Sequence, residues 1–223
     1  MRSMKMAIIE TIREGSVIHH EIEIKKSRFL TTLARTDSPE QARALIDAVK
    51  AEHPQARHNC SAYVIQVEGR DPHQHSSDDG EPSGTAGTPM LEALKLAGVW
   101  NVTAVVTRYF GGILLGGGGL IRAYSTAVSE ALAKAPRAHL KDIEVLEAHL
   151  LPGDAGRIEA ELRHGRAEIL GVDWGNEVSI RIGVNPGERE PFDALLASLS
   201  SGVSQFHMVA TRRIEVDGSH LKL

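Results

Sequence analysis

Six glycines among the nine residues from 111 to 119 are the feature that most restricts how this chain of 223 residues can fold. Glycine weakens the interior of helices and strands alike, so this run predicts a tight loop. A β-branched segment at 102–107 precedes the run and predicts a strand, which we expect to be central in its sheet. Apolar residues at helical spacing follow at 120–134. The glycines therefore predict a loop that connects a central strand to a long helix.

The residues before this unit predict a sheet and two more helices. Ser38 is a suitable N-cap with Pro39 behind it, and His53-Pro54 ends that helix. The segment from 68 to 87 is polar and rich in Gly, Pro, Asp and Ser, which predicts loop throughout. The expected elements are strands at 17–24, 29–34 and 61–67, a helix between Ser38 and His53, a loop at 68–87 and a helix at 88–98.

The second half of the chain has a clear alternation of strands and helices. Its order is βαββαβ, the split-βαβ unit of ferredoxin-like folds. The expected elements are strands at 143–151, 167–174, 178–184 and 203–216 and helices at 153–164 and 191–200. We therefore expect an α+β protein built from two-layer α/β sandwiches, with domains at 1–139 and 140–223.

Composition excludes several classes of protein. The net charge of −4 gives no overall basic character of the kind that strong duplex binders show, and 4% aromatic residues argue against a base-stacking sheet of the RRM kind. No apolar run approaches the length of a membrane span, and the N-terminus does not resemble a signal peptide. The single cysteine, Cys60, excludes a disulfide framework and predicts a cytoplasmic protein.

An acidic block at 77–87 is the first candidate for chemistry. Asp78, Asp79 and Glu81 place three carboxylates within four residues, and small hydroxyl and glycine residues follow. One interpretation is a hydrogen-bonding loop that orders a helix start, and another is a site for a hard cation such as Mg²⁺. A solvated acidic turn is the third. The spacing does not match an EF-hand.

The glycine run is the second candidate, because glycine loops and helix N-termini present backbone N–H groups to anions. Two arginines flank it and could add charge-assisted hydrogen bonds. The segment is neither a dinucleotide-binding motif nor a P-loop. The alternative is a tight turn that lets the helix pack close to the sheet. The expected anion-binding residues are Arg108, Gly111, Gly112, Gly116, Gly117, Gly118, Gly119 and Arg122.

Three histidines near Cys60 are the third candidate. A Cys–His nucleophile pair or a zinc site using His58, His73 and His75 is conceivable. However, the spacing lacks the paired short intervals of structural zinc sites, and Cys60 fits better as a small buried residue. We therefore expect no catalytic residue, no metal ligand and no cofactor.

Five segments form one long and specific signature: 26–29, 58–62, 78–87, 106–113 and 118–124. In order and spacing they resemble the IMPACT/YigZ family over about residues 16–135. The resemblance implies a first domain similar to a ribosomal-protein domain, to domain IV of elongation factor G and to the GHMP kinases. It implies a second domain similar to the ferredoxin-like C-terminal domain of elongation factor G. The family usually has a lysine where this chain has Leu114, which weakens a direct phosphate interpretation.

The resemblance also implies a function, since eukaryotic relatives regulate translation under stress and nucleic-acid or ribosome binding is suggested for bacterial ones. We expect a non-enzymatic regulator that binds RNA, the ribosome or a translation-regulatory protein through the glycine and arginine site. The alternatives are a metal-dependent small-molecule or phosphoester enzyme that uses the acidic block, and a purely structural signature. The residues expected to organise the site are His58, Asp78, Asp79, Gly80, Glu81, Ser83, Gly84 and Thr85.

Overall fold

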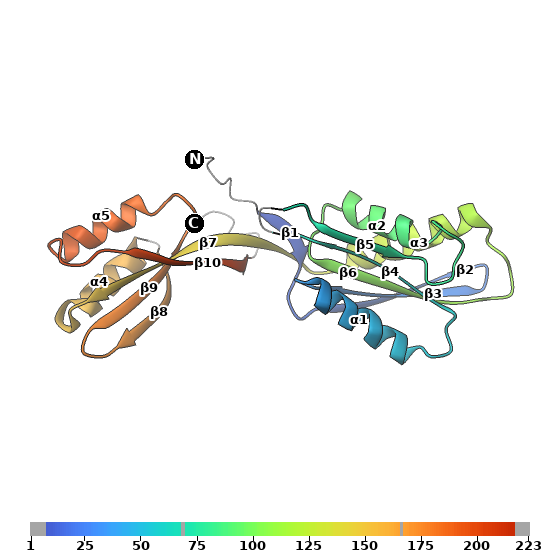
Figure 1. Ribbon diagram of the computed structural model, residues 1–223, viewed down its shortest axis with the longest axis horizontal. Coiled ribbons are helices and arrows are strands. Elements are labelled where there is room, and N and C mark those ends of the chain that lie inside the picture. The colour runs from blue at the N-terminus through green and yellow to red at the C-terminus, as the bar shows by residue number, and fades with distance from the viewer. Residues whose placement is uncertain (1–7, 68–69, 166, 217–223) are drawn as a thin grey trace. The chain divides into compact units, whose positions relative to one another are not determined.

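The computed structural model describes residues 8–67, 70–165 and 167–216, which fold into two compact units (Figure 1). One unit is Ile9–His139, and the other contains the described residues from Leu140 onward. The described part is α+β, with two antiparallel sheets and five helices. The predicted domains also include residues 1–7 and 217–223, which lie outside the described residues. No described helix is long and apolar enough to cross a membrane.

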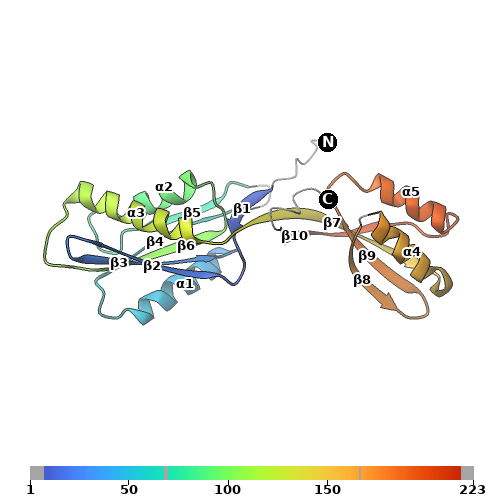
Figure 2. The same cartoon turned by 180° about the vertical axis from the view of Figure 1, so that it is seen from behind.

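The first unit is built on a five-stranded sheet with β6 at its centre, as the sequence predicts. Helices cover both faces: α1 lies on one, and α2 and α3 lie on the other (Figures 1 and 2). In spatial order the strands are β2 (Val17–Ile24), β3 (Ser27–Arg35), β6 (Val102–Tyr109), β4 (His58–Ile65) and β5 (His73–Ser77). The helices are α1 (Pro39–Glu52), α2 (Gly87–Leu96) and α3 (Gly117–Lys134).

Local sequence explains these elements. The hydroxyl of Ser38 accepts a hydrogen bond from the N–H of Gln41 at 3.3 Å, and Pro39 opens α1 as predicted. All residues of β6 from Val102 to Arg108 are buried, because helices pack against both faces of the central strand. This double burial explains why β6 is a continuous β-branched run rather than an alternating one.

Three of the differences from the sequence predictions concern the first unit. Residues 73–77 form β5 inside the segment predicted as loop, part of which (68–69) lies outside the described residues. β5 is an edge strand whose side chains are mostly exposed, so its polar sequence hid it. A short first strand, β1 (Ile9–Ile12), was not predicted. Helix α3 begins within the glycine run, where the N–H groups of a first turn need no intrahelical partner.

The second unit contains the predicted βαββαβ succession. Its strands lie in the order β10, β7, β9, β8. The apolar residues of one sheet face pack with both helices into a single core. The elements are β7 (Arg137–Leu150), α4 (Pro152–His164), β8 (Glu168–Trp174), β9 (Val178–Val184), α5 (Glu190–Leu199) and β10 (His207–Val216).

Candidate functional site at the glycine-loop end

One end of the first sheet collects most of the predicted site residues. Strand register places Arg28 beside Tyr109 and His58 beside Arg108, so the β2–β3 turn, the start of β4 and the end of β6 lie together. The glycine loop leaves β6 at this end and leads into α3. We call this region the glycine-loop end.

Asp78 is turned toward the backbone that starts α2. Its carboxylate accepts hydrogen bonds from the N–H groups of Gly84 at 2.8 Å, Ala86 at 3.0 Å and Gly87 at 2.8 Å. Ala86, the N-cap residue, has no side-chain cap of its own, so Asp78 satisfies these groups from outside the helix. Partial burial raises the pKa of Asp78, but the three N–H groups outweigh it and hold that pKa below its ordinary value.

The Asp78 carboxylate is expected to add stability that depends on pH. Because its pKa is lower in the folded protein, its contribution is full above the unfolded pKa of about 3.9 and is lost as pH falls through the folded pKa. Urea unfolding of wild type and Asp78→Asn should differ clearly at about pH 7 and much less at about pH 2.5. A difference that stays the same at both pH values would contradict this role.

Asp79 connects three segments of the first unit. Its carboxylate accepts from the Asn59 N–H at 2.7 Å and from the Lys50 ammonium at 2.8 Å, and its carbonyl accepts from His58 Nδ1 at 2.9 Å. Partial burial raises the pKa of Asp79, but Lys50 and the Asn59 N–H lower it more. Asp79 therefore fixes the loop against the start of β4 and the end of α1.

Glu81 and Arg108 form a buried ion pair. Arg108 Nη1 donates to Glu81 Oε1 at 2.7 Å, and the two side chains are only 8% and 3% exposed. Tyr124 also donates to Glu81, at 2.8 Å, while Arg108 Nη2 donates weakly to Ser27 Oγ at 3.4 Å. Burial raises the pKa of Tyr124 well above its usual range, so its hydroxyl remains a donor. Arg108 thus anchors the fold, and direct contact between Arg108 and a ligand stays a prediction.

The other residues expected to organise the site are also engaged in the loop or lie on its surface. The Thr85 hydroxyl donates to the Pro82 carbonyl at 2.6 Å. Gly80 has a φ of +88° and packs beside the His58 ring. Ser83 is exposed. Asp78 and Asp79 thus hold the acidic loop through backbone N–H groups, Glu81 binds the side chains of Arg108 and Tyr124, and the role of this block in organising a ligand site stays a prediction.

The metal and nucleophile interpretations find no geometric support. No group of three or more His, Cys, Asp or Glu residues in the described ranges could hold a metal ion. The pairing of β5 with β4 places His75 beside Tyr63, on whose ring it stacks, and His73 beside Ile65, so neither approaches His58. Burial raises the pKa of Cys60 to about 12, which keeps the thiol protonated and unreactive.

The glycine loop is packed tightly against the β2–β3 turn. A Cβ on Gly111 would lie 2.0 Å from the carbonyl carbon and oxygen of Lys26, so only glycine fits there. The Gly111 N–H also donates to Ser27 Oγ at 3.2 Å. Gly112 and Gly116 have φ values of +83° and +72°. The loop is therefore fixed to the turn by backbone contact.

The start of α3 keeps the features of an anion site. Gly116, its N-cap, has no capping side chain, and its carbonyl accepts from Gly119 and Leu120. The N–H groups of Gly117 and Gly118 have no partner within the described part of the chain, and the first turn carries no acidic residue. Arg122 lines a small groove of about 160 Å³ here together with Lys25 and Gly119. The structure thus brings Arg122 and the glycines together, and anion binding stays a prediction.

The β2–β3 turn is the feature that the sequence interpretation undervalued. Lys25 and Lys26 alone connect the two strands, and their φ values are +48° and +63°. Such two-residue turns favour Asn-Gly, because positive φ is unfavourable for residues with a Cβ. In the sequence, the only signal for this turn is two lysines between a pair of predicted strands, a pattern equally typical of solvated charges at a strand edge.

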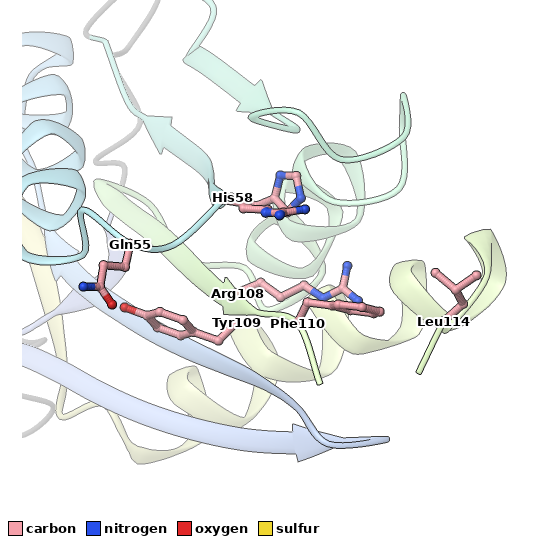
Figure 3. A pocket seen from close by; sticks show the side chains of 7 residues that line it. Gln55, His58, Arg108, Tyr109, Phe110 and Leu114 are labelled. Carbon is pink, nitrogen blue, oxygen red and sulfur yellow. The ribbon is translucent and has the colours of Figure 1, made fainter. Parts of the chain in front are cut away.

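A groove of about 650 Å³ opens beside this turn at the ends of β4 and β6. Tyr109, Arg108 and Phe110 lie along one side of it, with His58 on the opposite side (Figure 3). None of its lining residues is acidic. Sequence reasoning missed Gln55, Arg57, Tyr109 and Phe110 as members of this site, because no motif connects the α1–β4 loop to the end of β6. The lining residues are Gln55, Arg57, His58, Arg108, Tyr109, Phe110 and Leu114.

Comparison with known proteins identifies the family. Residues 25–132 match the Impact N-terminal domain, and residues 152–203 match a domain of unknown function, DUF1949. The chain is 39% identical to IMPACT family member YvyE of Bacillus subtilis (strain 168), over 95% of this chain and 96% of YvyE. It is 43% identical to IMPACT family member YigZ of Escherichia coli (strain K12), over 82% of this chain and 90% of YigZ. This chain therefore belongs to the IMPACT family.

Solved structures agree with this assignment. The crystal structure of a hypothetical protein is 38% identical, covers 91% of this chain and 98% of its own, and superposes with a TM-score of 0.63. A more distant match is the two-domain translational regulator Yih1, 34% identical over 56% of this chain and 48% of its own. Its TM-score of 0.39 is too low for a structural argument.

Proposed function

We propose that this protein is a non-enzymatic RNA-binding factor of the translation apparatus and that RNA phosphates contact the glycine-loop end. Translation is the setting implied by the IMPACT family rather than by any likeness of three-dimensional structure. The proposal includes a ferredoxin-like second domain related to that of elongation factor G. The strand order β10, β7, β9, β8, with both helices on one face, supports that part of it.

The observation that carries this proposal is the strained lysine turn. Each non-glycine residue at positive φ costs on the order of 1 kcal/mol, and such strain collects at functional sites. Lys25 and Lys26 are both exposed, and neither forms an ion pair with a described residue. A turn chosen for stability alone would place Asn-Gly here. The presence of two lysines in this strained turn is better explained by contacts between their ammonium groups and RNA phosphates.

Two more exposed cations lie at the same end. Arg57 enters the groove beside β4, and Arg122 lies in the first turns of α3. Neither forms an ion pair with a described residue, in contrast to Arg28, whose guanidinium lies 2.6 Å from Glu21. The N–H groups of Gly117 and Gly118, which have no partner among the described residues, join these cations in a local anion-binding surface on a chain whose net charge is −4.

The enzymatic alternative is weaker because its proposed metal ligands are already engaged. Asp78 binds backbone N–H groups, Asp79 binds Lys50, and Glu81 binds Arg108. Their carboxylates face different partners and do not converge on one point that a cation could occupy. We therefore favour binding over catalysis.

Replacing the turn by Lys25→Asn/Lys26→Gly is expected to stabilise the fold and weaken RNA binding. Relief of strain should add about 1–2 kcal/mol to the free energy of unfolding. Loss of two phosphate contacts should reduce the slope of log K against log salt by about 1.4 for a single strand. Urea unfolding and fluorescence anisotropy with a labelled single-stranded RNA at several salt concentrations measure the two effects.

The matched control is Arg43→Gln/Lys95→Gln, which also removes two exposed cations but leaves the glycine-loop end unchanged. Arg43 lies in the first turns of α1, and Lys95 lies in the last turn of α2. The control should keep the wild-type salt slope. If the turn variant binds RNA with unchanged affinity and slope, or if wild type binds no RNA, the proposal is wrong.

A further inference from the structure

We infer that the groove at the glycine-loop end holds an unpaired nucleobase, so that the preferred ligand is single-stranded rather than duplex RNA. This inference rests on the proposed function and specifies its ligand. The low aromatic content of the chain argues against an RRM-like sheet of stacked bases, but one exposed ring at a concave site is enough for one base.

The stacking surface is the ring of Phe110, which is 56% exposed. The guanidinium carbon of Arg108 lies 5.7 Å from the centre of this ring and 5.4 Å from that of Phe29. Glu81 holds Arg108 from the interior, and the Arg108 guanidinium lies against Phe110 (Figure 3). This contact supports Phe110, which is still half exposed. A large exposed phenylalanine held in this way is a prepared stacking surface rather than a mobile loop residue.

Hydrogen-bonding groups face the same groove. His58 Nδ1 donates to the Asp79 carbonyl, so in the neutral ring Nε2 is left as an acceptor. Gln55 is exposed and offers an amide donor and an amide acceptor. Arg57 lies on the wall beside them and can reach a phosphate. A nucleobase needs an apolar face, donors and acceptors at its edge and a nearby cation, and the lining supplies all three.

The size and shape of the groove favour a base that is free of its partner strand. Its volume of about 650 Å³ is ample for one nucleotide. In an A-form duplex the bases are stacked and paired, and their faces cannot enter a concave site. A basic peptide would find no acidic lining residue. An acidic peptide could bind the cations but would not need the aromatic ring. The experiment therefore includes an acidic peptide as a competitor to distinguish it from RNA.

The experiment measures binding of the full chain to a labelled single-stranded RNA, to the same strand in a duplex, and to a strand of equal length that lacks bases. We expect Phe110→Ala to weaken single-strand binding about tenfold, the usual loss for one stacked base, and to leave duplex binding within about twofold. The salt slope should not change, because no charge is removed. Leu96→Ala, which removes a side chain 91% exposed at the end of α2, is the matched control and should change nothing.

The outcomes separate this inference from the function on which it rests. The nucleobase site alone is overturned if RNA binding depends on Lys25 and Lys26 but is unaffected by Phe110→Ala. It is also overturned if the strand without bases binds as strongly as the single-stranded RNA. Absence of any RNA binding overturns both. Displacement of the RNA by an acidic peptide of equal charge, with equal loss of peptide affinity in Phe110→Ala, would assign the groove to a protein partner and overturn the inference. Gln55→Ala should also lower the affinity for single-stranded RNA, by less than Phe110→Ala does, and should leave duplex affinity unchanged.

Discussion

Glu81→Ala is expected to lower the free energy of unfolding by about 3–5 kcal/mol, because it leaves a buried arginine without its partner. Their side chains are only 8% (Arg108) and 3% (Glu81) exposed, so the buried guanidinium would lose its carboxylate partner with little bulk water to replace it. The Tyr124 hydroxyl loses its acceptor at the same time. Urea or thermal unfolding of the purified chain measures the effect.

A double-mutant cycle tests whether the ion pair itself is responsible. Glu81→Ala/Arg108→Ala removes both charges, so it should cost less than the sum of the two single substitutions. The exposed pair of Glu92 and Lys95 is the control, and Glu92→Ala should cost no more than about 0.5 kcal/mol. If Glu81→Ala costs less than about 1 kcal/mol, Arg108 is not held as the structure indicates and is available to a ligand.

The elements that the sequence predicts well are those whose local signals agree with their environment. Ser38 and Pro39 cap and open α1 because the backbone there needs an acceptor and tolerates a missing N–H. The apolar run of β6 correctly indicates a central strand covered on both faces. By contrast, β5 is stabilised by backbone pairing with β4 at a sheet edge, and its exposed polar side chains carry no strand signal.

The site could be located from the sequence, but the directions of its side chains could not. Spacing shows that Arg108 ends a strand beside the glycine loop and that Glu81 lies in an acidic block. It does not show that the two meet, because their contact depends on how β6 and the preceding loop pack. The structure therefore gives Arg108 an anchoring contact with Glu81 that the sequence did not indicate, and its contact with a ligand stays a prediction. Lys25 and Lys26, by contrast, gain importance from backbone angles that no residue pattern reports.

These corrections give the signature a physical explanation. Asp78 and Asp79 hold the acidic loop against α2 and β4, Glu81 fixes Arg108, and Arg108 in turn supports Phe110. In the proposed function, the acidic residues thus hold the loop beside the binding surface, while the cations of that surface come from other segments.

Gly111→Ala is expected to cost more than about 3 kcal/mol of stability, because the added methyl group meets backbone that cannot move aside without separating the loop from the turn. The new Cβ would lie 2.0 Å from the Lys26 carbonyl carbon and 2.4 Å from the Ser27 nitrogen. Separation would also break the Gly111–Ser27 hydrogen bond. Urea unfolding measures the loss, and RNA binding of the folded fraction should fall because Lys25 and Lys26 move away from α3.

Two neighbouring glycines separate this steric effect from the general cost of replacing glycine. Gly112 has a φ of +83° but open space around it, so Gly112→Ala should cost only about 1 kcal/mol of backbone strain. Gly117 lies at the first position of α3, where a Cβ would come no closer than 3.9 Å to Thr85, so Gly117→Ala should be nearly neutral. Equal costs for all three substitutions would mean that the loop does not rest on the turn. The expected ranking, Gly111 far above Gly112 and Gly112 above Gly117, requires that backbone contact, which keeps the two lysines beside the start of α3.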